Sequence, residues 1–162
     1  MDVNLKEKPW ASYIEQDLRE LLEESHLLLE AVPKWGETFL DYSFVVFPAA
    51  KAYEGFLKKL FFDLGFITKD DYYGKRFRIG KALNPALEPY LREKEGVYDK
   101  LVNFCGGKNL ANELWETWRQ CRNLVFHWFP DEKNAIGFEI AKSRVEMIIA
   151  AIDRAFTECK IK

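Results

Sequence analysis

The sequence predicts an all-α fold, a single-domain bundle of about four or five helices over residues 1–162. Three observations support this prediction. Apolar residues recur at spacings of three and four in several long segments, which places them on one face of a helix. No segment alternates apolar and polar residues as a half-buried strand does. A length of 162 residues suits one domain, and no linker or repeat divides it.

Composition limits the classes of partner. Hydrophobic residues make up 48% of the chain and charged residues 31%, which is typical of a globular protein. The net charge of −2 gives no general attraction to nucleic acid or anionic lipid, so any polyanion site must be local. The N-terminal residues lack the apolar run of a signal peptide, and no run reaches the ~20 apolar residues of a membrane span. We expect a cytoplasmic protein with no membrane partner.

The three cysteines are Cys105, Cys121 and Cys159, an odd number with no CxxC pair. This pattern argues against a disulfide framework and against a zinc site. It predicts a protein of a reducing compartment, and nothing in the sequence indicates a metal or another cofactor.

The first helix is predicted within an N-terminal segment of residues 1–34. Ser12 and Glu15 have the spacing of a capping box, in which each side chain covers a free backbone N–H of the first turn. Apolar residues then recur at helical spacing, and the helix should end before Pro33. His26 follows two glutamates, which predicts a solvated histidine on the polar face.

A longer apolar pattern covers residues 35–64 and predicts a second helix. Pro48 lies inside it, and because proline removes one helical hydrogen bond, the helix should kink or restart there. Gly65 is a plausible C-terminal stop.

Glu54 falls within the apolar stripe of this helix, where a carboxylate is costly unless it is paired or protonated. An i,i+4 pair with Lys58 is the ordinary explanation. Alternatively, the buried face is centred on Tyr53, Phe56 and Leu60. The carboxylate would then lie at the edge of that face.

Residues 68–89 contain several helix-interrupting residues and one local cluster of positive charge. The cluster consists of Lys75, Arg76, Arg78 and Lys81. It is either a solvated loop or a loop that binds RNA through its phosphates. Residues 86–104 predict one or two short helices before a turn at Gly106 and Gly107.

Two helices are predicted in the last third of the chain. The first opens at Lys108 or Asn109 and stops at Pro130. Its predicted buried stripe is Leu110, Leu114, Trp118, Cys121, Val125 and Trp128. A polar turn over 131–137 precedes the final helix, whose stripe is Phe138, Ala141, Val145, Ile148, Ile152 and Ala155.

The segment WRQCRNLVFHWFP, residues 118–130, combines residue types that suit phosphodiester cleavage. A neutral imidazole takes or gives a proton near neutral pH, so His127 could act as general base or acid. The guanidinium of Arg122 could stabilise the charge that grows on the phosphorus in the transition state. This chemistry requires no metal.

The spacing of this pair is unusual for a single helix face, because residues five apart lie roughly 140° apart around an ideal helix. Asn123 and His127 do share a face, with Arg119 one turn further back, so Asn123 and Arg119 are candidate supporting residues. Either the helix is distorted towards Pro130, or the site lies in a cleft that wraps the helix and that a second subunit could complete.

Arg122-Asn123-x-x-x-His127 resembles the R-x(4–6)-H signature of HEPN-domain ribonucleases, in which Asn, Asp or His commonly follows the arginine. The nearest resemblance is to the ribonuclease domain of RnlA/LsoA-type toxins, in which a glutamate on an earlier helix completes the site. Glu54 matches that glutamate. The resemblance covers residues 35–160, a HEPN-like core.

The resemblance implies a metal-independent RNA endonuclease of a toxin–antitoxin or phage-defence system, inhibited by a protein antitoxin. It implies that Arg122, His127 and Glu54 are catalytic, and that a homodimer forms a composite site. The alternative is a non-catalytic HEPN-like module that binds a partner, a nucleotide or RNA. That alternative is motivated by the excess of aromatic residues, particularly Trp115, Trp118, Trp128 and Phe129, which could form an exposed association surface as easily as a core.

Overall fold

The chain is described by a computed structural model, which covers residues 4–131 and 134–160. In that part of the chain there are eight α-helices and no strand, so the predicted all-α class is confirmed. The α-helices are α1 (Gln16–Ala31), α2 (Ser43–Asp63), α3 (Lys69–Tyr73), α4 (Ile79–Ala82), α5 (Pro89–Glu95), α6 (Tyr98–Phe104), α7 (Gly107–Trp118) and α8 (Phe138–Glu158). The helix count exceeds the prediction because residues 69–104 form four short helices where loops and one or two helices were expected.

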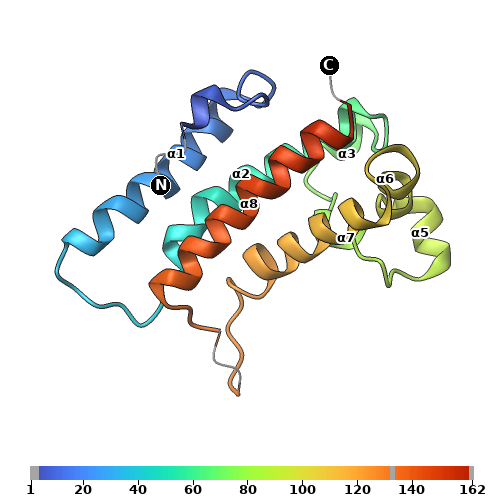
Figure 1. Cartoon of the computed structure of the whole chain (residues 1–162). Helices are drawn as coiled ribbons and strands as arrows, with labels where there is room; N and C mark the ends of the chain where they lie inside the picture. Colours follow the sequence, from blue (N-terminus) through green and yellow to red (C-terminus); the bar gives the residue numbers. More distant parts are fainter. Residues whose placement is uncertain (1–3, 132–133, 161–162) are drawn as a thin grey trace.

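The long helices α2 and α8 run side by side through the middle of the molecule (Figure 1). Helix α1 packs on α2, and α7 packs on α8. Among the short helices, α6 packs against α7, whereas α3 and α4 pack against α2 and α5 packs against α4 (Figure 1). Buried side chains from all of the long helices join in one apolar cluster.

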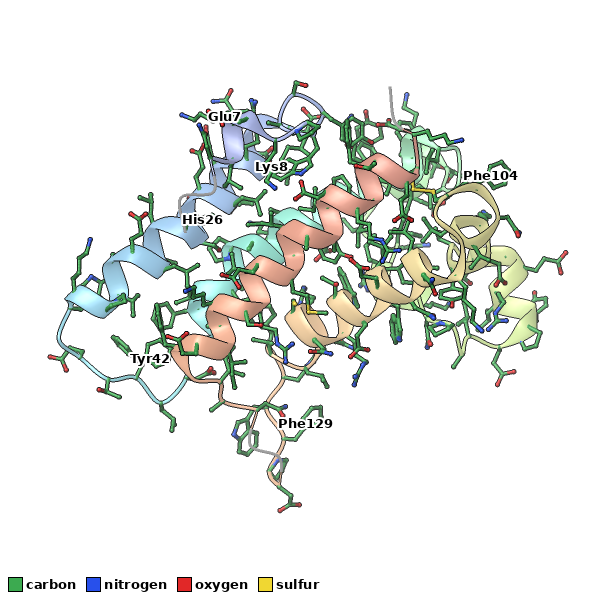
Figure 2. All side chains as sticks on the ribbon, viewed as in Figure 1. Glu7, Lys8, His26, Tyr42, Phe104 and Phe129 are labelled. Atoms are coloured by element: carbon green, nitrogen blue, oxygen red, sulfur yellow. A yellow bond between two sulfur atoms is a disulfide. The ribbon has the colours of Figure 1, made fainter. Side chains whose placement is uncertain are left out.

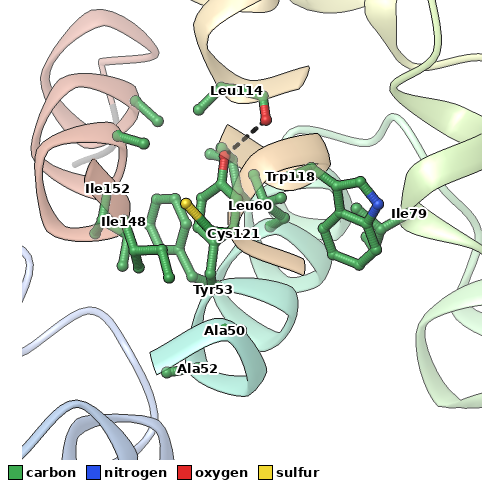
Figure 3. Packing of buried hydrophobic residues seen from close by; sticks show 14 of the residues in the cluster. Ala50, Ala52, Tyr53, Leu60, Ile79, Leu114, Trp118, Cys121, Ile148 and Ile152 are labelled. Carbon is green, nitrogen blue, oxygen red and sulfur yellow. Dashed lines mark hydrogen bonds between the residues drawn. The ribbon is translucent and has the colours of Figure 1, made fainter. Parts of the chain in front are cut away.

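Tyr53 of α2 lies at the centre of this cluster with no exposed surface. Its hydroxyl donates a 3.0 Å hydrogen bond to the backbone carbonyl of Leu114 in α7 (Figure 3). A buried hydroxyl needs such a partner, because an unpaired one costs about 1–3 kcal/mol. The bond therefore fixes α7 against α2 in one register.

Helix α2 runs through Pro48 without a break, so the predicted restart does not occur. Next to the proline, the backbone N–H of Ala49 donates to the hydroxyl of Ser25, which is fully buried on α1. The helix begins at Ser43, eight residues later than predicted. It ends as predicted before Gly65, whose φ of +70° is a left-handed conformation that favours glycine.

Two predictions for α1 were wrong. The helix begins after Glu15, whose side chain makes no capping bond, so Ser12 and Glu15 form no capping box. The buried Trp10 and the turn around it occupy the segment where that box was expected. His26 is half-buried against α8 rather than solvated, and its Nε2 atom is buried.

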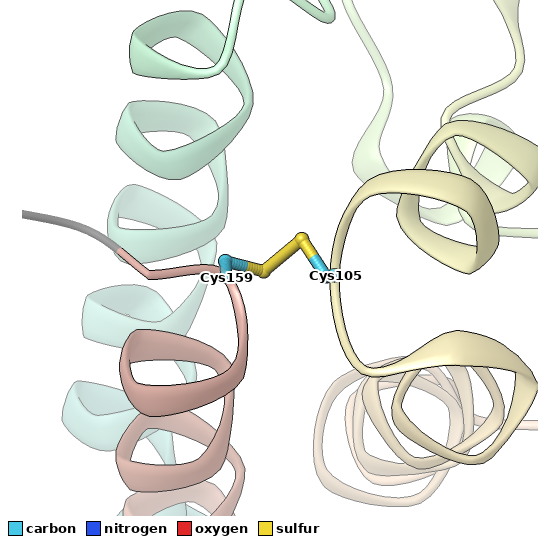
Figure 4. The surroundings of a disulfide bond; sticks show 2 residues. All are labelled: Cys105 and Cys159. Atoms are coloured by element: carbon cyan, nitrogen blue, oxygen red, sulfur yellow. A yellow bond between two sulfur atoms is a disulfide. The ribbon is translucent and has the colours of Figure 1, made fainter.

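Cys105, directly after α6, and Cys159, directly after α8, form a disulfide (Figure 4). The prediction that the cysteines form no disulfide was therefore wrong. The two residues are 54 positions apart, and packing of α6 on α7 and of α7 on α8 brings their Cα atoms to 4.3 Å. Cys121 is a free, buried thiol. Among the described helices, none is long and apolar enough to cross a membrane.

Candidate functional site

Arg122 lies on a π-helical turn, Arg119–Asn123, that continues α7. The turn is closed by a 2.9 Å hydrogen bond from the N–H of Leu124 to the carbonyl of Arg119, five residues back instead of four. After Leu124 the chain leaves the helix, so the helix predicted up to Pro130 ends earlier. The helix is thus distorted, as one of the two alternatives allowed, but at residues 119–123 and not next to Pro130. Trp128, predicted in the buried stripe, is 81% exposed.

The guanidinium of Arg122 meets the carboxylate of Glu54 on α2, with Nε 3.4 Å from Oε2. Both side chains are about two-fifths exposed, at 37% and 43%. Glu54 lies at the edge of the helix face formed by buried Tyr53, Phe56 and Leu60, which is the second of the two predicted orientations.

Lys58, the alternative partner of Glu54, points elsewhere. Its ammonium donates a 3.2 Å hydrogen bond to the carbonyl of Gly74.

A pocket of about 230 Å³ opens beside this ion pair. Its lining is Phe47, Ala50, Lys51, Glu54, Arg122 and Phe126. The Arg122 guanidinium carbon lies 5.8 Å from the ring centroid of Trp118 and 5.6 Å from that of Phe126. Such cation–π contacts help to hold the guanidinium in place. Glu54 accepts only from Nε, and the terminal N–H groups of Arg122 make no hydrogen bond with the described residues, so they could bind an anion in the pocket.

Sequence reasoning missed Lys51, the second cation of this pocket, although it lies three residues before Glu54 on the same helix. It also missed Phe126, whose ring packs edge-on against Phe47 at 5.5 Å. The helical spacing between Lys51 and Glu54 was the signal that could have identified Lys51.

His127 is exposed and follows the helical part of the chain. It makes no hydrogen bond or ion pair with Arg122 or Glu54 among the described residues. Instead it lines a neighbouring pocket of about 660 Å³ together with Trp128 and Phe129.

Phe126 lines both pockets. Figure 2 shows Phe129 on the loop that projects beyond the bundle. Within one chain, the arginine and the histidine of the motif thus occupy adjacent pockets.

The two supporting residues lie outside these pockets. Arg119 pairs with Glu116, three residues earlier, through Nη2 to Oε1 at 2.7 Å and Nε to Oε2 at 2.9 Å. The hydrogen bond from Arg119 lowers the pKa of Glu116 and raises the pKa of Arg119. Asn123, the last residue of the π-helical turn, is exposed.

The four cations of the predicted RNA-binding loop do not all lie at one site. Arg76, Arg78 and Lys81 line a third pocket near α4, whereas Lys75 is exposed outside it. Two lining cations that the sequence reasoning missed, Lys94 and Lys100, come from α5 and α6. No group of three or more His, Cys, Asp or Glu within residues 4–131 and 134–160 is arranged to hold a metal ion.

Comparison with known proteins gives one match. The family model described as RnaseLS-like HEPN matches residues 27–86, so the HEPN resemblance is confirmed. The matched region contains Glu54 and the basic loop and ends before Arg122. No curated protein and no solved structure matches the chain significantly.

Proposed function

We propose that this RnaseLS-like HEPN protein is a metal-independent RNA endonuclease that cleaves by attack of the ribose 2′-hydroxyl. One observation carries the proposal: Arg122 is held by Glu54 at the rim of an open pocket, with His127 in the next pocket. Arginine and histidine in these positions supply the charge stabilisation and the proton transfer that the reaction needs.

In this reaction the 2′-oxygen attacks the adjacent phosphorus. The O2′–P bond forms, the P–O5′ bond breaks, and the products carry a 2′,3′-cyclic phosphate and a 5′-hydroxyl. His127 takes the 2′-proton or protonates the leaving 5′-oxygen. Arg122 stabilises the negative charge on the non-bridging oxygens.

Glu54 acts as a positioning residue in this proposal. An exposed ion pair contributes only about 0–1 kcal/mol to stability, so the pair with Arg122 matters chiefly for orientation. Together with the flanking rings of Trp118 and Phe126, Glu54 restricts the guanidinium to the pocket rim.

We further propose that two copies of the chain form a composite site. One histidine cannot be base and acid at the same moment, and a second copy supplies the second His127. Support comes from exposed apolar side chains around the two pockets. They are Phe47 at the first pocket and Leu40, Trp128 and Phe129 at the second. A cluster of exposed large apolar side chains is typical of interaction sites.

The oligomeric state tests this part of the proposal. Light scattering coupled to size-exclusion chromatography should give a dimer for the native chain. Trp128→Ser should shift it towards monomer and reduce cleavage with it, because Trp128 is 81% exposed and contributes little to the core. A native monomer with full activity would refute the composite site.

In the cell we propose a cytoplasmic toxin of a toxin–antitoxin or phage-defence system, controlled by a protein antitoxin. In that compartment we expect Cys105 and Cys159 to be reduced. The RnaseLS-like HEPN match supports a ribonuclease, and the resemblance to RnlA/LsoA-type toxins suggests this role. Induced expression should arrest bacterial growth, and expression of His127→Ala to the same level should not.

Cleavage itself is tested with purified protein and labelled RNA in excess EDTA. We expect cleavage to persist, and the products to carry 2′,3′-cyclic phosphate ends. Arg122→Ala and His127→Ala should each reduce the rate by roughly 10²–10⁴, the usual contribution of a general acid–base or charge-stabilising group. His26→Gln is the matched control, because His26 lies on α1, away from both pockets. Full activity in both site variants would refute the proposal.

A second candidate function is supported by the exposed aromatic side chains of Trp128 and Phe129. They could bind a partner protein, with the chain serving as a non-catalytic HEPN-like module. In that case no RNA is cleaved, and Trp128→Ser abolishes partner binding while His127→Ala leaves it intact.

A further inference from the structure

A pocket of about 370 Å³ lies among the short helices, between the loop after α3 and helices α4 to α6. Five cationic side chains line it: Arg76, Arg78, Lys81, Lys94 and Lys100. Two acidic side chains, Asp71 and Glu95, also line it. The pocket therefore has a strong excess of positive charge in a protein whose net charge is −2.

Both acids of the pocket are already engaged. Glu95 pairs with Lys81 at 2.6 Å. The carboxylate of Asp71 accepts hydrogen bonds from the N–H and hydroxyl of Thr68 in a capping box, at 3.0 and 2.7 Å. Neither acid pairs with the other cations among the described residues.

The other cations of the pocket have N–H donors that make no hydrogen bond with the described residues. Lys100 donates to the carbonyl of Phe66 at 2.8 Å, which anchors its ammonium at the pocket. Arg78 donates one N–H to the carbonyl of Lys75 at 2.8 Å. Arg76 and Lys94 make no hydrogen bond or ion pair with any described residue. Convergent like charges repel one another, and an anion in the pocket would relieve that repulsion.

The chemistry of the lining favours a phosphate group. Guanidinium groups match phosphate oxygens with paired donors, and ammonium groups add point charges. Phe77 also lines the pocket and offers an aromatic ring on which a base could stack. A concave site with arginines and an aromatic ring suits a nucleic-acid strand better than an acidic protein surface, which could be bound by a flat patch of lysines.

Two contacts connect the segments that carry this pocket to the Glu54–Arg122 site. Lys58, one helical turn or about 6 Å along α2 from Glu54, bonds Gly74 at the start of the basic loop. Gly80 of α4 lies directly against the indole of Trp118, so close that a Cβ there would be 2.6 Å from Nε1. That indole lies beneath Arg122.

We propose that the pocket binds a phosphate of the RNA strand a few nucleotides from the bond that is cleaved. The inference rests on the proposed ribonuclease function and adds to it a second anchoring point, with Arg76, Lys94 and Lys100 as its main phosphate ligands. Lys75 is not among the proposed phosphate ligands, since it lies outside the pocket.

The experiment measures RNA binding separately from cleavage. The full chain with His127→Ala is titrated, in EDTA, into a short fluorescein-labelled single-stranded RNA, and anisotropy is recorded at several salt concentrations. In this background we compare Arg76→Gln/Lys94→Gln with Lys75→Gln. Arg76, Lys94 and Lys75 are all exposed and outside the core, so these variants should fold normally, which circular dichroism verifies.

The pocket variant should weaken binding at least tenfold. It should also reduce the slope of log K against log salt by about 0.7 for each phosphate that the variant no longer neutralises. Lys75→Gln should change both quantities far less. A neutral-backbone oligomer of the same sequence should bind equally weakly to all variants. Competition by a mononucleotide or inorganic phosphate at low concentration would indicate a free-phosphate site and would overturn the strand proposal.

An equal decrease in binding free energy per removed charge in the pocket variant and in Lys75→Gln would overturn the proposal, since it would reflect net charge alone. Unchanged binding in the pocket variant would also overturn it and would leave an acidic protein partner as the occupant to test. These outcomes differ from failure of the proposed function, in which the native chain binds RNA without cutting it.

Discussion

Glu54 pairs with Arg122, 68 residues further along the chain, and not with Lys58 on its own helix. A local i,i+4 pair would have fixed Glu54 to the surface of α2. The pair across two helices instead couples α2 to the π-helical turn after α7. The carboxylate of Glu54 therefore orients the guanidinium of Arg122 from a different helix.

Glu54→Gln should therefore reduce the cleavage rate strongly and the stability only slightly. Because the pair is exposed, the free energy of unfolding should fall by no more than about 1 kcal/mol. Cleavage should fall by roughly 10²-fold, the effect of misplacing a reacting group by about 1 Å. Rates on labelled RNA and urea unfolding curves measure the two quantities.

Glu116→Gln is the control for this variant, since it breaks the pair with Arg119 outside the pocket. It should leave cleavage close to native. Equal reductions of the cleavage rate by Glu54→Gln and Glu116→Gln would mean that Glu54 does not position Arg122.

Gly80→Ala should disturb the site through Trp118. The new methyl group would meet Trp118 Nε1 at 2.6 Å, so the indole must move, at a typical cost of about 1–3 kcal/mol. Because that indole lies beneath Arg122, cleavage should fall together with stability. Thermal unfolding, Trp fluorescence and RNA cleavage are the measurements.

Gly137→Ala is the matched control, because a Cβ at Gly137 has no atom within 4 Å and its φ is not positive. Native-like cleavage in Gly80→Ala would show that the indole does not support Arg122.

The helices with a periodic apolar pattern were predictable from the sequence. The contacts between these helices were predictable only in part. The stripe from Ala141 to Ala155 is buried as expected, because packing on α2 follows the local pattern. The pocket cations Lys94 and Lys100 carry no periodic signal, since they come from two short helices that the chain path brings beside Arg76. The position of His127 was also not predictable, because it depends on how the π-helical turn ends.

The disulfide between Cys105 and Cys159 should stabilise the fold mainly by restricting the unfolded chain. For a separation of 54 residues, loop-closure entropy gives about 4 kcal/mol. The variant Cys105→Ser/Cys159→Ser should lose up to that amount in urea unfolding without a reductant. The same variant should match the native chain once the native chain is reduced.

Thiol titration provides a direct check on the bond. Burial raises the pKa of the Cys121 thiol to about 12, so the folded chain should react slowly with alkylating reagents. After unfolding without reductant, one thiol should titrate, since Cys121 is the only free cysteine. Three thiols under those conditions would disprove the disulfide.

Stability should decrease in mild acid through His26. Burial lowers its pKa from the ordinary 6.5, against the opposing effects of Glu30 and Glu146. Below pH 6.5 the unfolded chain therefore binds a proton that the folded chain resists, so the free energy of unfolding falls as pH falls.

Melting temperatures measured between about pH 7.5 and 5.5 should show this decline, and His26→Gln should flatten it. An identical pH dependence in the variant would assign the decline to other groups.

The π-helical turn Arg119–Asn123 holds one more residue than an ordinary helical turn. The wider turn absorbs the extra residue, so the residues after it keep nearly the places they would have beyond an ordinary turn with one residue fewer. A deletion of one residue between Trp118 and Arg122 should therefore restore an ordinary helix without carrying Arg122 away from Glu54. Related sequences are expected to tolerate a difference of one residue in this turn while they keep the pairing.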